Sequence, residues 1–492
     1  MLEPSSSHRS RSLPPQKILL VKPHARLNTI LGLQRFMLLE PLEFGYLAAA
    51  VPGHEVKVLD LRLHRAPLKV FEHTLRRYKP DIVGFTGYSH ESTAMKQLAQ
   101  RVRERLPMAR VVTGGHHATS APHDLDIPQV DAIVRGEGCE AFRQVVDAVA
   151  EGKDLTGIPN VLVPGVAYDG EAAAGWPLAT DPALMPQPRR DLWNPKSYYT
   201  VWAAEKLPRF ASVFPQVAMV RTSWGCPMKC SFCVVPHLSQ QTHRPRPVDV
   251  VCDDLESIET DYIYFSDDEN FINKDFSWEL AEEIERRGIK KRYFAWTRST
   301  TVNRSPELMQ KWADIGLDGA FIGFEFIDDK ELKAHTKAST VRANEQALDT
   351  LRSQDIVVHA AFILKSEYDE DDFEKLRAYV REMPPSQCSF TCFTPIPGTA
   401  EYGDYEKQFW VPKERAYDLH DCMHPLMKTK LPLKEFSQRF ATQIVEGIRK
   451  TPLRSNHHLA PPMDMLRVWQ ADRGYYHGFR KLYQDYPEEL WD

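Results

Sequence analysis

Three cysteines in one short segment constrain this chain more than any other feature. They stand at C-x3-C-x2-C spacing in Arg221-Thr-Ser-Trp-Gly-Cys226-Pro-Met-Lys-Cys230-Ser-Phe-Cys233, directly after an apolar, β-branched run. Thiolates gathered in this way are ligands for zinc, copper(I) or an iron–sulfur cluster. A structural zinc site closes with four ligands, whereas this segment supplies three. The motif therefore predicts a metal centre with one coordination position left open.

A zinc site is the alternative interpretation of the same segment. His237 and His243 follow the cysteines closely enough to supply a fourth ligand. The chain would then be a metal-sensing or binding protein without catalysis. That interpretation leaves the motifs further along the chain without a role.

The length and composition are those of a globular protein with two or three domains. The chain has 492 residues, of which 42% are hydrophobic and 26% are charged. A formal net charge of -5 gives no general attraction to nucleic acid or to an anionic membrane, so we expect no polyanionic partner. Eight cysteines over this length do not form a disulfide framework, and reduced thiols indicate the cytoplasm. We also expect no membrane span and a disordered tail over residues 1–16.

Short apolar strands alternate with helices in the first third of the chain. Such alternation predicts an open parallel sheet, in which ligands bind beyond the carboxyl ends of the strands. Three glycine-containing loops, residues 84–90, 114–119 and 135–138, follow such strands. Glycine there lets the backbone approach a bulky ligand, although ordinary glycine turns are the simpler alternative. The expected strands are residues 17–21, 54–60, 82–86, 110–113 and 132–135, and helices are expected over residues 40–50 and 91–105.

A second alternating array begins at the cysteine segment. Counting the strand before Cys226, it has six βα units, fewer than the eight of a closed TIM barrel. A Pro- and Gly-rich linker separates the two arrays and is apolar enough to pack on both. The last residues should form a helical cap over the barrel mouth, with an amphipathic helix over 433–449. The expected divisions are 1–16, 17–153, 154–216, 217–411 and 412–492.

The cysteine segment and the second array resemble the radical S-adenosylmethionine (SAM) superfamily. In that superfamily three cysteines hold a 4Fe-4S cluster, SAM chelates the fourth iron, and six βα units form a partial TIM barrel. The resemblance implies that Cys226, Cys230 and Cys233 are the cluster ligands. It also implies that Phe232, the aromatic residue before the last cysteine, lies against the adenine of SAM.

Polar groups at the expected ends of the barrel strands suit the parts of SAM. By the same resemblance, Asp267 and Asp268 lie near the methionine end and Glu325 lies near the ribose or the amine. Arg298 has the geometry to pair a carboxylate bidentately. The turn Pro395-Ile-Pro-Gly-Thr399 lies near the adenine. Each of these carboxylates taken alone could equally be a solvated loop residue.

The first array resembles the cobalamin-binding domain that precedes the cluster domain in one large radical SAM group. The glycine loops then contact cobalamin, with these residues: Thr86, Ser89, Gly114, Gly115 and Gly136. The sequence departs from the methionine-synthase pattern Asp-x-His-x-x-Gly, because the corresponding place reads Lys22-Pro-His24-Ala-Arg-Leu27. The acidic partner of the histidine is absent. His24 and Arg26 are therefore weak candidates for the lower face of the cobalt.

The two halves together resemble the cobalamin-dependent (class B) radical SAM methyltransferases. The segments Arg244-Pro-Arg-Pro-Val-Asp-Val-Val-Cys-Asp-Asp-Leu and Phe393-Thr-Pro-Ile-Pro-Gly-Thr look most like the branch that contains hopanoid C-3 methylases. This implies transfer of a methyl group from SAM, through methylcobalamin, to an unactivated carbon of an apolar small molecule. A flavodoxin or ferredoxin would supply electrons. The expected pocket lies between the two domains, with Trp202, Trp469 and Tyr476 as candidates for its wall.

A related activity is the second interpretation of the same cofactors. The anaerobic oxidative cyclase of the bacteriochlorophyll pathway resembles this architecture too. A cobalamin-dependent radical oxidation or ring closure of a tetrapyrrole-like substrate therefore stands beside methyl transfer. Both interpretations use the cofactors for the difficult chemistry and leave the protein to orient the reactants and exclude water.

Overall fold

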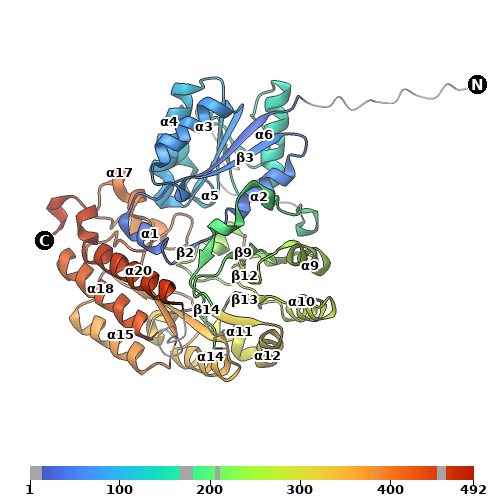
Figure 1. Ribbon diagram of the computed structural model, residues 1–492. Coiled ribbons are helices and arrows are strands. Elements are labelled where there is room, and N and C mark those ends of the chain that lie inside the picture. Colours follow the sequence, from blue (N-terminus) through green and yellow to red (C-terminus); the bar gives the residue numbers. More distant parts are fainter. Residues whose placement is uncertain (1–13, 167–180, 206–210, 385, 451–460) are drawn as a thin grey trace, which may run out of the picture.

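The computed structural model describes residues 14–166, 181–205, 211–384, 386–450 and 461–492, arranged as two sheets with their helices (Figure 1). The first thirteen residues of the expected tail, with parts of the linker and of the C-terminal region, lie outside this description. Within the described residues, no helix is both long and apolar enough to cross a bilayer.

The first sheet has six strands in the order β3-β1-β4-β5-β6-β7, and only β7 runs antiparallel to its neighbour. Its central strands are apolar on both faces because helices cover both sides. Strand order reverses between β1 and β4, so a ligand crevice is expected where these two strands end. The strands are β1 (Lys17–Lys22), β3 (Glu55–Asp60), β4 (Ile82–Thr86), β5 (Arg110–Gly114), β6 (Ala132–Val134) and β7 (Val161–Leu162).

The helices of this half begin largely where the sequence indicated. The helix expected over residues 40–50 begins at Leu42, and the one expected over 91–105 begins at Ser92. The helices are α1 (Asn28–Leu33), α2 (Leu42–Ala50), α3 (Pro67–Tyr78), α4 (Ser92–Arg105), α5 (His116–Ser120) and α6 (Gly138–Glu151). Short 3-10 turns are η1 (Leu61–Leu63), η2 (Ser89–Glu91) and η3 (Pro122–Leu125).

The second sheet confirms the six expected βα units. All of its strands are parallel, in the order β16-β15-β14-β13-β12-β9. The strands are β9 (Val217–Val220), β12 (Tyr262–Phe265), β13 (Arg292–Thr297), β14 (Leu317–Glu325), β15 (Val357–Leu364) and β16 (Gln387–Cys392). The helices are α8 (Val235–Leu238), α9 (Val248–Ser257), α10 (Lys274–Arg286), α11 (Ser299–Arg304), α12 (Pro306–Asp314), α13 (Asp329–Ala334), α14 (Val341–Ser353) and α15 (Glu370–Glu382).

The two faces of this sheet differ in burial. Alternate residues such as Phe265, Ala295 and Phe362 are fully buried against the outer helices and form the largest core. The other alternate residues, which face the barrel interior, mostly keep partial solvent exposure. The inner face of the sheet is therefore less completely buried than its outer face.

The linker packs on both halves, as expected from its aromatic residues. The Tyr198 hydroxyl is 3.2 Å from a carboxylate oxygen of Asp60 in the first half. The Trp202 indole N–H donates to Asp318 of the second half over 2.7 Å. Its elements are η4 (Pro182–Leu184), η5 (Arg190–Leu192), η6 (Pro195–Ser197) and β8 (Tyr199–Thr200), which pairs with β2 (Met37–Leu38). A second small ribbon pairs β10 (Ser223–Trp224) with β11 (Arg244–Pro245).

The C-terminal region is helical, and its longest helices lie beside the barrel. Apolar residues at helical spacing, from Leu433 to Ile444, bury one face of α18 (Leu433–Lys450) against β16 and α15. The open edge of the last strand is thereby covered. The other elements are α16 (Tyr402–Glu406), α17 (Lys413–Ala416), η7 (Tyr417–Leu419), α20 (Pro462–Arg480), η8 (Leu482–Asp485) and η9 (Glu488–Leu490).

A buried charged network ties this region together. The fully buried His424 ring lies 3.0 Å from Asp421 on one side and 3.0 Å from Asp485 on the other. Although burial alone would lower it, the two carboxylates raise the pKa of His424 to about 9. The Thr29 hydroxyl of α1 also donates to Asp421 over 3.1 Å, so the network reaches the first half.

Candidate functional site

The cysteine segment follows the carboxyl end of β9, at the mouth of the barrel. Cys226 and Cys230 are buried, and Cys233 is half-buried. Burial raises the pKa of the Cys226 thiol and raises that of Cys233 to about 12. Metal binding would have to displace these protons, because thiolates are the ligating form.

Asp267 and Asp268 hold the start of the cysteine segment through hydrogen bonds. The buried Asp267 carboxylate accepts hydrogen bonds from the backbone N–H and hydroxyl groups of Thr222 and Ser223. Asp268 accepts from the Gly225 N–H over 2.9 Å and pairs with Arg221. These oxygens are occupied by the chain's own donors, so both residues act as braces for the cysteine loop.

A second set of contacts fixes the loop between Cys230 and Cys233. The Ser231 N–H donates to the His335 carbonyl over 3.1 Å, and its hydroxyl donates to Glu401. The His335 ring also contacts Glu401 and lies 5.9 Å from the Phe232 ring. Phe232 thus sits edge-on to a histidine at the barrel mouth, and the His335–Glu401 pair was not foreseen from the sequence.

Arg298 and Glu325 lie in one chain of polar contacts beside the cysteines. An Arg298 N–H points at the Cys230 sulfur over 3.3 Å, and another donates to the Lys337 carbonyl. The Lys337 ammonium pairs with Glu325 over 2.6 Å. Glu325 has φ of +66° at an irregularity of β14, where a side chain on Gly323 would collide with the carboxylate. This costly backbone conformation aims the carboxylate into the barrel mouth.

Glu269 is the functional candidate that the sequence analysis did not single out. One carboxylate oxygen accepts from the Thr297 hydroxyl over 2.8 Å, while the other is buried without a hydrogen-bond partner. Burial raises the pKa of Glu269 to about 7. The Nε of the neighbouring Arg298 is also buried without a partner. A buried unsatisfied pair of this kind fits a polar ligand that completes it.

The described residues do not form a ligand set for a single zinc ion. Among these residues, no three His, Cys, Asp or Glu side chains converge where one ion could bind. His237 lies against Gly398 in the 395–399 turn instead. A 4Fe-4S cluster does not need such convergence, because each thiolate binds a different iron atom. The residues present therefore fit a cluster better than a single zinc ion.

The glycine loops of the first sheet meet one another closely. Gly115 has φ of +92°, and a Cβ there would lie 2.3 Å from the Thr86 hydroxyl oxygen. The Thr119 hydroxyl accepts from the Gly136 N–H over 3.0 Å, which joins the next loop. Gly114 ends β5 beside Val134 with room around it. Four of the five expected cobalamin contacts thus gather at one edge of the sheet.

Ser89, the fifth expected cobalamin contact, forms a hydrogen bond within the first half. It is buried, and its hydroxyl lies 3.1 Å from the His117 ring, whose other nitrogen is 2.9 Å from Asp124. His24 is half-buried, and burial lowers its pKa. The exposed Arg26 lies 3.9 Å from Asp418 of the C-terminal region. These placements leave no residue singled out beneath a cobalt ion.

Tyr88 and His116 lie where the edges of the two sheets face each other. Tyr88 is 50% exposed and His116 is also exposed, yet their rings contact each other at 4.9 Å. Surrounding protein atoms lower the pKa of His116. The charges with the largest effect on this pKa are those of Asp268 and Arg221 in the second half. The loops that carry Tyr88 and His116 therefore lie beside the start of the cysteine segment. The Arg244–Glu137 ion pair closes one side of this junction.

The barrel interior beside this junction is aromatic. Tyr264 stacks on Phe294 at 5.2 Å, and Trp296 lies 4.0 Å from Phe321. His359 lies 4.9 Å from Phe321, and burial lowers its pKa to about 4, so its imidazole is neutral. Aromatic side chains therefore line the barrel interior, and none of them is among the residues expected at the pocket wall.

The three aromatic residues considered for the pocket wall lie elsewhere. Trp202 is fully buried at the amino ends of the barrel strands, against Val217 and Tyr262. Trp469 is 55% exposed on α20, and Tyr476 lies beside Arg480 of the same helix. That part of the expectation is wrong, because the sequence does not show which end of the barrel a linker residue reaches.

Comparison with known families identifies the two halves. Residues 29–146 match the B12 binding domain, and residues 220–380 match the radical SAM superfamily. The chain is a radical SAM enzyme with a B12-binding domain. Its cofactors are cobalamin, SAM and a 4Fe-4S cluster. Both matches fall within the divisions expected from the sequence, 17–153 and 217–411.

Known proteins of similar sequence or fold cover most of this chain. Hopanoid C-3 methylase of Methylococcus capsulatus is 29% identical over 407 residues, which cover 82% of this chain and 75% of that protein. The anaerobic magnesium-protoporphyrin IX monomethyl ester cyclase of Rubrivivax gelatinosus is 28% identical, covering 71% and 62%. The solved structure of the radical SAM methyltransferase TsrM from Kitasatospora setae has a TM-score of 0.63 at 17% identity, covering 96% and 98%. That structural likeness shows the shared fold.

Proposed function

We propose that this radical SAM enzyme transfers a methyl group to an unactivated carbon of a mostly apolar substrate. The observation that carries the proposal is that loops at the carboxyl edge of the first sheet lie beside the start of the cysteine segment. Tyr88 and His116 from the first sheet lie there within electrostatic reach of Arg221 from the second. One substrate carbon could therefore be reached from both sides.

The proposed ligands of the cluster are Cys226, Cys230 and Cys233, which the Asp267 and Ser231 contacts hold in place. When bound, the cluster and SAM supply a radical that removes hydrogen from carbon, and methylcobalamin supplies the methyl group. The protein contributes binding, orientation and exclusion of water. No side chain is needed as a nucleophile.

Four polar groups at the barrel mouth suit SAM. The Glu325 carboxylate, paired with Lys337, is placed for the ribose or the amine. Glu269 and Arg298 each keep one buried polar atom free for the methionine end. Burial raises the pKa of Glu269, so this group can bind as a protonated donor or as a carboxylate near neutral pH.

The aromatic interior supports an apolar substrate. Phe294, Trp296 and Phe321 line it, and His359 is the polar member of this group. The hopanoid C-3 methylase named above acts, by its name, on a polycyclic lipid, which would suit such a lining. We also propose that a flavodoxin or ferredoxin supplies electrons and that the enzyme works in the cytoplasm.

The fate of methyl-deuterated SAM tests the proposal. Anaerobically reconstituted protein would be given a hopanoid preparation and, in parallel, a magnesium-protoporphyrin ester. We expect a product with one labelled methyl group, while deoxyadenosine and S-adenosylhomocysteine accumulate together. The Cys226→Ala variant is the matched control and should form neither.

Oxidation or ring closure is the second candidate function, because the cyclase named above is 28% identical over 71% of this chain. It would yield deoxyadenosine without S-adenosylhomocysteine and an unlabelled product. That result would refute methyl transfer while leaving the assigned cofactors intact.

A further inference from the structure

Helix α20 packs one side on the rest of the protein. Tyr475 lies against Gly32 of α1, and Phe479 contacts Phe440 of α18 at 4.7 Å. Ala471 and Phe479 are buried on this side. The helix is therefore firmly seated, and its opposite face is a fixed part of the surface.

The opposite face of α20 is unusually apolar for a surface. The described residues include ten exposed large hydrophobic side chains, and four of them lie in one seven-residue stretch of this helix, residues 463–469. They are Met463 (73% exposed), Met465 (37%), Leu466 (45%) and Trp469 (55%). Single exposed apolar residues need no explanation, but a group of this kind marks an interaction site.

Cationic side chains accompany this apolar group. Arg473 and Arg480 are exposed on the same helix, and Arg473 lies 5.5 Å from the Trp469 ring. Arg467 lies 3.9 Å from the Tyr199 ring. Among the described residues, none of these guanidinium groups forms an ion pair with a carboxylate. The exposed positions of α20 contain no acidic residue.

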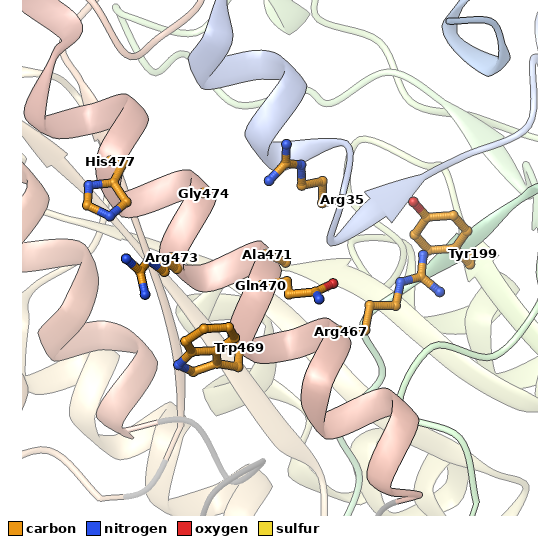
Figure 2. Close-up of a pocket in the computed structure, with 9 residues that line it drawn as sticks. All are labelled: Arg35, Tyr199, Arg467, Trp469, Gln470, Ala471, Arg473, Gly474 and His477. Atoms are coloured by element: carbon orange, nitrogen blue, oxygen red, sulfur yellow. The ribbon is translucent and has the colours of Figure 1, made fainter.

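A cavity of about 680 Å³ lies between α20 and the segment after α1 (Figure 2). Its lining contains three guanidinium groups and a histidine but no carboxylate. The charged and aromatic lining residues are Arg35, Tyr199, Arg467, Trp469, Arg473 and His477. Guanidinium groups bind phosphate oxygens through paired hydrogen bonds, so this cavity suits a phosphate.

We propose that α20 docks on an anionic lipid bilayer, with its apolar side chains in the interfacial region and a lipid phosphate in the cavity. Helices that lie on membranes combine basic residues with exposed Trp and Leu in this way. A free phosphate would explain the arginines but not the four exposed apolar side chains. The net charge of -5 does not oppose docking, because electrostatic attraction acts within about a Debye length of the contacting face. The inference is independent of the proposed substrate.

Flotation of the full-length protein with vesicles tests this surface. Vesicles of phosphatidylcholine alone would be compared with vesicles that also contain phosphatidylglycerol. The test variant is Trp469→Ser/Arg473→Gln, which changes two exposed side chains. The matched control is Leu68→Ser/Arg65→Gln, which changes an exposed leucine and an exposed arginine elsewhere. Thermal melts would verify that both variants are folded.

We expect the protein and the control variant to float with the anionic vesicles only. The test variant should bind at least about fivefold more weakly, since one basic residue near such a surface contributes ~1 kcal/mol and 1.4 kcal/mol is tenfold. Lack of flotation, equal flotation with neutral vesicles, or equal loss in both variants would overturn the proposal. Binding of glycerol 3-phosphate without flotation would assign the cavity to a small anion and would also overturn it.

Discussion

Replacing Asp267 with asparagine should loosen the cysteine segment while keeping the size of the side chain. The carboxylate accepts from the Thr222 N–H over 3.0 Å, from the Thr222 hydroxyl over 2.8 Å and from the Ser223 hydroxyl over 2.6 Å. An asparagine oxygen can keep the contacts on one side. Its NH₂ group must then take the place of the oxygen that faces the Thr222 N–H at 3.0 Å, so two donors oppose each other and the buried NH₂ group has no acceptor.

The expected cost follows from two opposing effects. Hydrogen bonds to a charged group contribute about 1.5–3 kcal/mol each, and an unsatisfied buried donor costs about 1–3 kcal/mol. Burial already raises the pKa of Asp267, so part of this energy offsets desolvation of the carboxylate. We therefore expect a local loss of about 2 kcal/mol, which corresponds to roughly 30-fold weaker retention of the cluster.

Asp318→Asn is the matched control, because Asp318 is buried in the same barrel but at the amino ends of the strands. It accepts from Trp202 and pairs with Arg292 over 2.6 Å. Iron and sulfide per chain would be measured after anaerobic reconstitution and again during exposure to a chelator. We expect faster cluster loss in Asp267→Asn only. Equal cluster loss in the two variants, or none in Asp267→Asn, would refute the bracing role.

Three further predictions concern other parts of the protein. Glu325→Gln should weaken SAM binding about tenfold or more, because the substitution removes a negative charge at the barrel mouth. The cluster absorbance should stay unchanged. Equilibrium dialysis with labelled SAM would measure the loss of binding. Gly115→Ala should reduce retention of hydroxocobalamin, because its Cβ would lie 2.3 Å from the Thr86 oxygen, and unchanged retention would contradict the role of that loop. Because the pKa of His424 is raised to about 9, protonated His424 contributes to the free energy of unfolding. This contribution is complete below about pH 6.5 and is lost as the pH rises through 9, which lowers the free energy of unfolding by on the order of 3 kcal/mol. Denaturant unfolding across that range should show the fall, and His424→Gln should abolish it.

Much of the fold could be predicted from sequence because its strands are short, apolar and separated by helices. β9, β12 and β15 are such cases, and a single motif marked the barrel mouth. β7 and β8 were missed because two-residue strands carry no periodicity. The position of α20 beside the barrel depends on packing against α1 and α18, which no local pattern reveals.

The candidate site was predictable only where the residue type itself limits the chemistry. Cysteines at short spacing indicate a metal centre wherever they fold. The sequence does not show which groups a carboxylate at a strand end contacts, so the hydrogen bonds of Asp267 to the backbone of the cysteine segment were not predicted. Glu269 and Lys337 gain their importance from burial and from contacts between distant segments. Such contacts arise only in the folded protein.

Methyl transfer to one substrate carbon requires that cobalamin and the cluster bind at one junction between the two halves. Pulsed electron paramagnetic resonance on protein that carries both a reduced cluster and cobalt(II) cobalamin would test this. We predict a dipolar interaction between the two spins, which is absent when Cys226→Ala removes the cluster. If both centres are fully loaded and the spectrum is only the sum of the two separate spectra, the shared junction and the proposed methyl transfer are contradicted.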